Sequence, residues 1–289
     1  MSTGTQARAE VRHSQPRLGW APAVGAGALL AAAYLPVFGY LGQQWWDNEY
    51  FQHGPLIPLL AGYLLWRRRE ALAGLARRPS RLGLALVAGS LAVLVAGHAL
   101  GSLYTVQSLS LLGALVGSIA YLYGWGAVRA AAVPLAFLGF AIPWPWGVLE
   151  ALATPLQRLT TSYTALAAGL LALPVQQRGV DLFLGGFTLT VAVPCSGLKS
   201  AIALLALAGL YAAVAGGPPA ARLGLLALAV PVALAANVAR VLAVLLVAQA
   251  WGPGAALGFY HWGSGVALFA LAWLLLAALG RWVGCRPGD

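Results

Sequence analysis

Long apolar stretches separated by short polar runs dominate the chain and recur from residue 18 to residue 279. A helix of about twenty apolar residues is long enough to cross the hydrocarbon core of a bilayer. The pattern predicts an all-α polytopic membrane protein with about eight such helices, the second of them short. These helices are expected near residues 18–41, 53–66, 82–100, 105–123, 128–146, 196–214, 223–247 and 264–279.

One long segment between the fifth and sixth predicted spans has a different pattern. Between residues 147 and 173, apolar residues recur at helical spacing, and polar residues interrupt them on the other face. This arrangement predicts an amphipathic helix that lies along the outer membrane interface instead of crossing the bilayer. The apolar positions are Leu149, Leu152, Leu156, Leu159, Tyr163 and Leu166.

A short β-hairpin is predicted directly after this helix. Apolar residues alternate with other residues on both sides of Gly185-Gly186, up to Val193. Period-two alternation around a Gly-Gly pair is typical of two antiparallel strands joined by a tight turn. The hairpin would bring Cys195 to the mouth of the sixth predicted helix.

Composition supports the membrane assignment, because charged residues make up only 8% of the chain and hydrophobic residues make up 61%. A soluble protein of 289 residues needs more charge to keep its surface in water. The net charge of +10 does not indicate nucleic-acid binding, because the basic residues lie between apolar runs and not along one face. We expect membrane lipids as partners and no nucleic acid.

The distribution of basic residues predicts the orientation. With eight spans and a cytoplasmic N-terminus, all lysines and arginines except four would face the cytoplasm, as the positive-inside rule requires. The four on the outer side would be Arg158, Arg178, Lys199 and Arg240. The expected location is the cytoplasmic (inner) membrane, with both termini in the cytoplasm.

The predicted domain organisation follows from this orientation. Residues 18–283 would form a single membrane domain, in which residues 147–194 are the extracytoplasmic amphipathic helix and hairpin. Residues 1–17 and 284–289 would be cytoplasmic tails.

The candidate chemistry centres on Cys195. Pro194 ends the strand before it, and Gly197 allows a backbone or a substrate to come close. If a helix begins at Ser196, the thiol lies at its N-terminus, where the helix dipole favours a thiolate. The alternative is a small buried residue without reactivity. A disulfide with Cys285, the other cysteine, is not expected, because the predicted topology puts Cys285 on the opposite side of the membrane.

Two further residues are predicted to lie at the outer end with Cys195. Arg240 lies inside the seventh predicted span, where an arginine costs about 2.5–3.5 kcal/mol at mid-depth and so needs a function or a partner. Asn237 lies on the same helical face. His261 precedes the last span, and histidine is suited to proton transfer near neutral pH. The alternatives are an arginine that snorkels to the headgroups and a structural interfacial histidine.

A metal site is weakly indicated. Asp47, Glu49 and His53 are close in the sequence, but their spacing is not typical of metal ligands and they include only one imidazole. We therefore expect no metal and no cofactor.

At these residues the chain resembles the exosortase/archaeosortase family of membrane-embedded cysteine transpeptidases. The resemblance extends from about residue 45 to residue 280 and consists of five motifs in the family's order. They are residues 53–58 leading to 63–69, residues 141–145 with 155–157, residues 193–197, residues 237–240, and His261.

The resemblance implies a Cys-Arg-His catalytic set, which corresponds here to Cys195, Arg240 and His261. The candidate supporting or substrate-binding residues are Ser196, Gly197, Asn237 and His53. The resemblance also implies the substrates, which are exported proteins with a C-terminal recognition motif, transmembrane helix and basic tail, as in PEP-CTERM proteins. The predicted function is cleavage of this sorting signal through a thioacyl intermediate at the extracytoplasmic face.

Two other classes of protein remain open from the residues alone. In a transporter or assembly protein, Arg240 would bind an anionic substrate, although the chain shows no paired halves of the kind that many transporters have. An enzyme acting on lipid-linked glycans would use acidic residues at the same face, for which Asp47, Glu49 and Asp181 are available.

Overall fold

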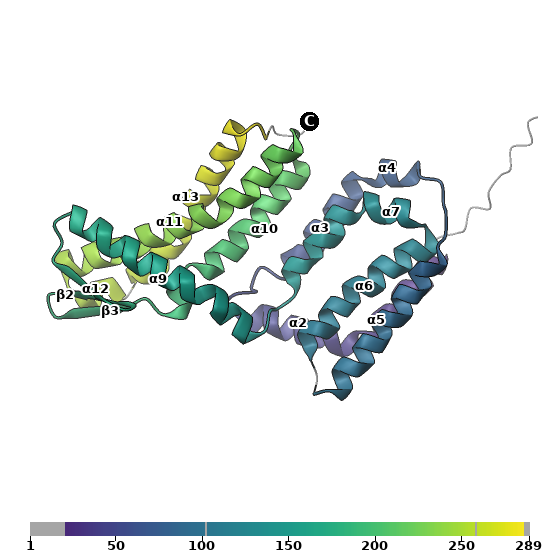
Figure 1. Cartoon of the computed structure of the whole chain (residues 1–289), viewed down its shortest axis with the longest axis horizontal. Coiled ribbons are helices and arrows are strands. Elements are labelled where there is room, and N and C mark those ends of the chain that lie inside the picture. The colour runs from purple at the N-terminus through teal and green to yellow at the C-terminus, as the bar shows by residue number, and fades with distance from the viewer. Residues whose placement is uncertain (1–20, 102, 258, 286–289) are drawn as a thin grey trace, which may run out of the picture.

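The computed structural model describes residues 21–101, 103–257 and 259–285, which form a mostly helical protein with one small sheet (Figure 1). The helices are α1 (Ala21–Ala33), α2 (Leu35–Asp47), α3 (Leu56–Arg67), α4 (Arg69–Ala73), α5 (Arg81–Ala99), α6 (Tyr104–Leu122), α7 (Trp125–Ala130), α8 (Ala132–Phe137), η1 (Leu138–Ala141), α9 (Trp146–Leu170), η2 (Val193–Cys195), α10 (Leu198–Val214), α11 (Pro219–Trp251), α12 (Pro253–Leu257) and α13 (Phe259–Trp282). The strands are β1 (Val175–Arg178), β2 (Asp181–Leu184) and β3 (Phe187–Thr190).

The described helices include fewer membrane spans than the eight predicted. Four of them, α5, α6, α11 and α13, are long and apolar enough to cross a bilayer. The count rises to six if α1 with α2, and the α8–η1 segment with α9, are each one broken span. The apolar helices α3 and α10 are shorter, with 12 and 17 residues. The membrane assignment stands, but the count of eight is not confirmed.

Both bent pairs break at prolines. The chain bends by 68° between α1 and α2, where Pro36 occupies the first turn of the second helix. It bends by 89° between the α8–η1 segment and α9, across Pro143 and Pro145. Proline lacks the N–H that an interior helical position needs, and its ring clashes with the preceding turn. The fifth predicted span, residues 128–146, is therefore divided into short helices.

A helix and a hairpin are present where the sequence predicted them, and the position of the helix along the membrane interface stays a prediction. The helix is α9, which lies with the sheet at one end of the molecule (Figure 1). Strands β2 and β3 pair antiparallel around Gly185 and Gly186, whose φ angles of 49° and 86° fit the tight turn. The structure adds a strand that the sequence did not indicate, because β1 pairs antiparallel with β2 and makes the sheet three-stranded.

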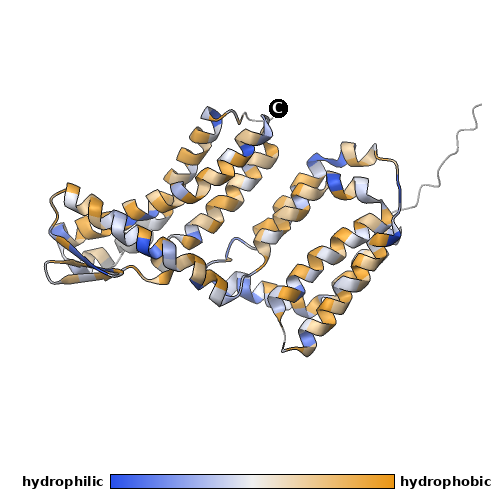
Figure 2. Ribbon diagram, in the orientation of Figure 1, coloured by the Kyte–Doolittle hydropathy of each residue, from blue (hydrophilic) through white to orange (hydrophobic). Residues whose placement is uncertain are grey.

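Two groups of helices make up the membrane body. In one group, α10 and α13 both pack on α11 around fully buried side chains that include Leu204, Leu225 and Leu276. In the other group, α5 packs on α6 through glycines. A Cβ on Gly83 would lie 2.4 Å from the backbone nitrogen of Tyr121, so only glycine allows this close approach. Figure 2 shows that apolar residues cover the helices and that hydrophilic residues gather towards their ends.

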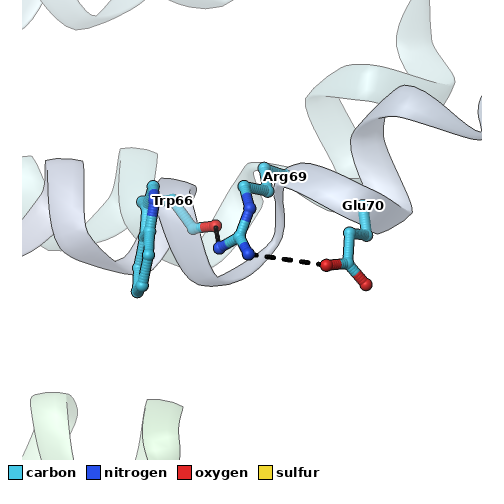
Figure 3. A network of polar contacts seen from close by, with 3 residues as sticks. All are labelled: Trp66, Arg69 and Glu70. Atoms are coloured by element: carbon cyan, nitrogen blue, oxygen red, sulfur yellow. Dashed lines mark hydrogen bonds and ion pairs between the residues drawn. The ribbon is translucent and has the colours of Figure 1, made fainter.

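One edge of the molecule, where α4 and α7 lie, α11 begins and α13 ends, is rich in arginine, and we call it the arginine end (Figure 1). In Figure 3, the guanidinium of Arg69 lies 4.4 Å from the ring centroid of Trp66 and donates a hydrogen bond of 3.2 Å to the Trp66 carbonyl oxygen. The same side chain forms an ion pair of 3.5 Å with Glu70. Stacked aromatic and basic side chains of this kind are typical of a membrane interface. The arginines at this end are Arg67, Arg68, Arg69, Arg77, Arg78, Arg81, Arg129, Arg222 and Arg281.

Candidate active site

The loop that carries Cys195 is a short 3-10 turn between β3 and α10. The Cys195 backbone N–H donates a hydrogen bond of 2.8 Å to the carbonyl oxygen of Ala192. Gly197 then takes a left-handed φ of +87°, and α10 begins at Leu198. The helix thus begins two residues later than the predicted start at Ser196. The thiol therefore lies before the helix N-cap instead of on it.

A buried amide holds this loop against α11. Asn237 is only 4% exposed, and its Nδ2 donates hydrogen bonds to the carbonyl oxygen of Cys195 at 2.8 Å and to Oγ1 of Thr160 at 3.2 Å. Oγ1 of Thr160, on α9, donates in turn to the carbonyl oxygen of Ser196 at 3.3 Å. Two helices, α11 and α9, therefore fix the backbone carbonyl groups of Cys195 and Ser196.

Gly197 is required at its position for two reasons. Its positive φ is costly for a residue with a side chain. In addition, a Cβ on Gly197 would lie 3.0 Å from the Cβ of Asn237, which is closer than ordinary packing allows. The glycine thus lets the loop approach α11 closely enough for the amide of Asn237 to reach the Cys195 carbonyl.

Ser196, another predicted supporting residue, is fully buried and does not line the pocket beside Cys195. Its Oγ accepts a hydrogen bond of 3.3 Å from the backbone N–H of Leu198. The hydroxyl therefore contributes to the start of α10 by accepting from one of the N–H groups that have no partner within the helix.

Cys195 and Arg240 line the same small pocket. Both residues are half-buried. Because Arg240 comes one turn after Asn237 on α11, the helix that holds the loop also brings a cation to the pocket that Cys195 lines. The pocket walls include apolar side chains, and an apolar surrounding strengthens the attraction between a fixed cation and a developing anion. The other lining residues are Leu189, Thr190, Val191, Val241 and Val244.

Arg240 also lines a second small pocket, which extends to Gly265 and Phe269 on α13. The arginine thus lies between Cys195 and the last helix. His261 belongs to the first turn of that helix, but its side chain is outside the part of the chain that the structure describes. Its convergence with Cys195 and Arg240 stays a prediction.

His53 lies in the turn between α2 and α3. Its ring forms a hydrogen bond with the backbone of Phe140 and lies 6.2 Å from the ring of Phe51. Burial lowers the pKa of His53 below its ordinary value, so the imidazole is neutral near neutral pH. These contacts connect His53 to the α8–η1 segment, and none of the contacts described for it is with Cys195. Within the described ranges, no three His, Cys, Asp or Glu side chains come together in a way that could hold a metal.

The structure shows one neighbour of Cys195 that the sequence did not indicate, namely the turn after α2. Glu49 forms an ion pair of 3.5 Å with Lys199, in the first turn of α10. Tyr50 and Phe51 pack in one apolar cluster with Leu198, next to the cysteine loop. The available signal was that this turn and Cys195 fell on the same predicted side of the membrane.

Polar residues of α9 form a second support that the sequence did not indicate. Besides Thr160, Gln157 donates a hydrogen bond from Nε2 to the carbonyl oxygen of Val191, in the segment between β3 and the cysteine loop. The two side chains lie about one helical turn apart, so the polar face of the amphipathic helix holds the approach to Cys195.

Cys285 lies far from this site. It is fully buried in the apolar cluster of α10, α11 and α13, together with Ala212 and Ala221, at the arginine end. Cys195 lies just before the N-terminal end of α10, whereas Cys285 packs near the C-terminal end of this helix. The expectation that the two cysteines do not form a disulfide is confirmed.

The fold and the pocket define a helical membrane protein that has a cysteine and an arginine at one end of its spans. The family model of the transmembrane exosortases matches residues 45–278, which is most of the chain. The chain therefore belongs to the transmembrane exosortase family. No curated protein and no solved structure matches it.

Proposed function

We propose that the protein is a cysteine protease-transpeptidase that cleaves the C-terminal sorting signal of exported proteins at the extracytoplasmic face of the membrane. The observation that carries this proposal is the shared pocket of Cys195 and Arg240, in a chain that belongs to the exosortase family. Its substrates are proteins whose C-terminus has a short recognition motif, a transmembrane helix and a basic tail.

In the proposed reaction, the Cys195 thiolate attacks the scissile carbonyl carbon, a C–S bond forms, and charge develops on the carbonyl oxygen. The tetrahedral intermediate then collapses, the C–N bond breaks, and the sorting tail leaves as an amine. His261 supplies the proton that this amine takes up. An acceptor amine or water then attacks the thioester and releases the acyl group from the sulfur, and His261 takes up the proton that the acceptor loses.

Arg240 acts in this scheme as a fixed cation beside the sulfur, where it stabilises the thiolate. Asn237 does not react. It holds the Cys195 carbonyl and the loop, so the sulfur keeps one position relative to Arg240. A precise position matters, because a misplacement of about 1 Å lowers the rate of such a reaction about 10²-fold.

The proposed orientation places the arginine end in the cytoplasm and the Cys195 pocket outside, in the inner membrane. Nine of the described arginines lie at the arginine end, as the positive-inside rule requires of a cytoplasmic face. A substrate whose basic tail stays in the cytoplasm would then present its recognition motif at the same face as Cys195.

Two of the three acidic residues that are available to a glycan enzyme, Glu49 and Asp181, are engaged in other contacts. Glu49 pairs with Lys199, and Oδ1 of Asp181 accepts a hydrogen bond of 2.7 Å from Thr190 within the sheet. The pocket beside Cys195 is lined by Arg240 and by uncharged residues. This pattern favours a thiol nucleophile over a pair of catalytic carboxylates.

The direct test is processing of an exported reporter that ends in a PEP-CTERM-type tail, followed by gel mobility in cells that produce each variant. Cys195→Ala should leave the uncleaved reporter in the membrane, because the acyl acceptor is lost. Cys285→Ala is the matched control and should process the reporter at the normal rate. Normal processing by Cys195→Ala would rule out the proposed function.

A further inference from the structure

Tyr50 has a buried hydroxyl without a hydrogen-bond partner among the described residues. The side chain is only 3% exposed and packs edge-on against Trp146, with 6.4 Å between the ring centroids. A hydroxyl that is buried without a partner costs folding free energy, and such groups are few in native proteins. A phenylalanine would fill the same space without this cost, so the hydroxyl calls for an explanation.

The position of Tyr50 next to the cysteine loop suggests an explanation for its buried hydroxyl. Tyr50 belongs to the apolar cluster that includes Val193 and Leu198, the residues that bracket the segment around Cys195. The adjacent Glu49 is tied to Lys199 by an ion pair of 3.5 Å. The turn after α2 is therefore held against both sides of the loop.

Tyr50 packs with Val193 and Leu198, which lie two and three residues from Cys195 on its two sides. Burial raises the pKa of Tyr50 above its usual 10.0, and Glu49 and then Cys195 raise it further. The phenol therefore keeps its proton near neutral pH and can donate a hydrogen bond. Arg240 lies in the pocket lined by β3 and α11, whereas Tyr50 packs with α9. Arg240 and Tyr50 therefore belong to two different parts of the surroundings of the cysteine loop.

We propose that Tyr50 is a further catalytic residue, whose hydroxyl donates a hydrogen bond to the substrate carbonyl oxygen as Cys195 attacks the adjacent carbon. This inference rests on the proposed function. In an acylated enzyme the carbonyl oxygen is two bonds from the sulfur, so it lies near any group that surrounds Cys195. The sulfur electron pair forms the C–S bond, the carbonyl electrons move to the oxygen, and the proton stays on Tyr50. The tyrosine thus contributes an oxyanion hydrogen bond, and Arg240 is left to stabilise the thiolate.

The test uses the full-length protein in membranes with the tail-bearing reporter, and compares Tyr50→Phe with wild type. Loss of one oxyanion donor should slow release of the tail about 10²-fold or more. The melting temperature should be equal to or above that of wild type, because the lost hydroxyl has no protein partner among the described residues. In a Cys285→Ala background Cys195 is the remaining thiol. There, Tyr50→Phe should change the rate of Cys195 alkylation by N-ethylmaleimide by no more than about twofold, because the loop is unchanged.

Tyr34→Phe is the matched control. The Tyr34 hydroxyl is also buried, but it lies between α1 and α2 and forms hydrogen bonds of 2.9 Å with Oγ of Ser110 and 3.3 Å with the carbonyl oxygen of Ser90. Its loss should lower the melting temperature and leave the rate of tail release unchanged.

Two outcomes would overturn the inference. The first is tail release by Tyr50→Phe within about threefold of wild type. The second is a parallel loss of tail release and of Cys195 alkylation, which would mean that the hydroxyl acts only on the loop. Cys195→Ala, assayed alongside, separates the two proposals. If that variant is inactive while Tyr50→Phe is active, only the role of Tyr50 fails. If Cys195→Ala is active, the proposed function itself fails.

Discussion

The two cysteines lie beyond opposite ends of α10, and their surroundings have little in common. Cys285 is fully buried among small apolar side chains at the arginine end. Cys195 is half-buried in a pocket that Arg240 also lines, in a loop fixed by Asn237. The 17 residues of α10 separate the two regions by about 26 Å at 1.5 Å per residue. The same side chain is a core residue in one region and a candidate nucleophile in the other.

The difference shows which features of the Cys195 region support a chemical role. Apolar contacts surround both cysteines, since Cys195 also packs against a buried cluster. Cys195 differs in two respects. Its loop, which contains a left-handed glycine, is tied to a neighbouring helix by a buried amide. It also shares a pocket with an arginine, and neither feature is found among the described residues around Cys285. The predictions below change these features one at a time.

The largest effect is expected from Arg240→Gln. The variant removes the cation beside Cys195 and should lower the rate of tail release about 10²- to 10³-fold, as loss of a preorganised electrostatic contact does. Arg222→Gln is the matched control, because Arg222 lies in the first turn of the same helix, at the arginine end. Reporter cleavage in membranes measures both variants. Equal rates for Arg240→Gln and Arg222→Gln would show that the position of the cation is irrelevant.

Thiol accessibility should also distinguish the two regions. With one cysteine retained at a time, Cys195 should react with N-ethylmaleimide at least about tenfold faster than Cys285, because Cys195 lines a pocket and Cys285 is fully buried. Mass spectrometry of the folded protein follows the modification. Faster labelling of Cys285 would contradict the contrast between the two surroundings.

A smaller effect is expected from Gly197→Ala. In this variant a residue with a side chain must take a φ angle of +87°, and its Cβ lies close to Asn237. The variant should therefore lose about 1–2 kcal/mol of unfolding free energy. Gly209→Ala, within α10, is the control, because a Cβ there meets Phe137 and Phe140 at an ordinary 3.8 Å. Thermal unfolding in detergent compares the two. A Gly197→Ala variant as stable as Gly209→Ala would mean that the loop does not need this conformation.

The smallest effect is expected from Glu49→Gln, which removes the ion pair with Lys199. Both side chains are 44% exposed, so the solvent screens the pair and its loss should cost only about 0.2–1 kcal/mol of unfolding free energy. The difference in unfolding free energy between low salt and about 1 M salt should be smaller in the variant than in wild type. An unchanged salt dependence would show that the pair does not contribute to stability.

The sequence predicted those features that depend on local spacing. Asn237 and Arg240 are three residues apart, so helical geometry places both on the face that reaches the cysteine loop. The Gly185-Gly186 pair likewise marked the hairpin, because two positive φ angles suit the tight turn between its strands.

The remaining features depend on contacts between distant segments. Thr160 meets Asn237 across 77 positions, and Glu49 meets Lys199 across 150, so no periodicity reveals either pair. The helix α10 starts at Leu198 because Gly197 takes a left-handed backbone conformation. A glycine can adopt several conformations, so its presence in the sequence did not predict this one. The count of eight spans is not confirmed, because prolines near residues 36 and 143 break helices that composition alone makes continuous.

The central claim is that Cys195 accepts the acyl group of the substrate, and the thioester itself is the most direct evidence of this. Wild-type protein would be incubated with the tail-bearing reporter, quenched in acid and digested, and the peptides would be searched by mass spectrometry for an acyl adduct that hydroxylamine releases. The account predicts this adduct on the peptide with Cys195 and not on the peptide with Cys285. An active enzyme that gives no adduct on Cys195, or one on Cys285 in its place, would contradict it.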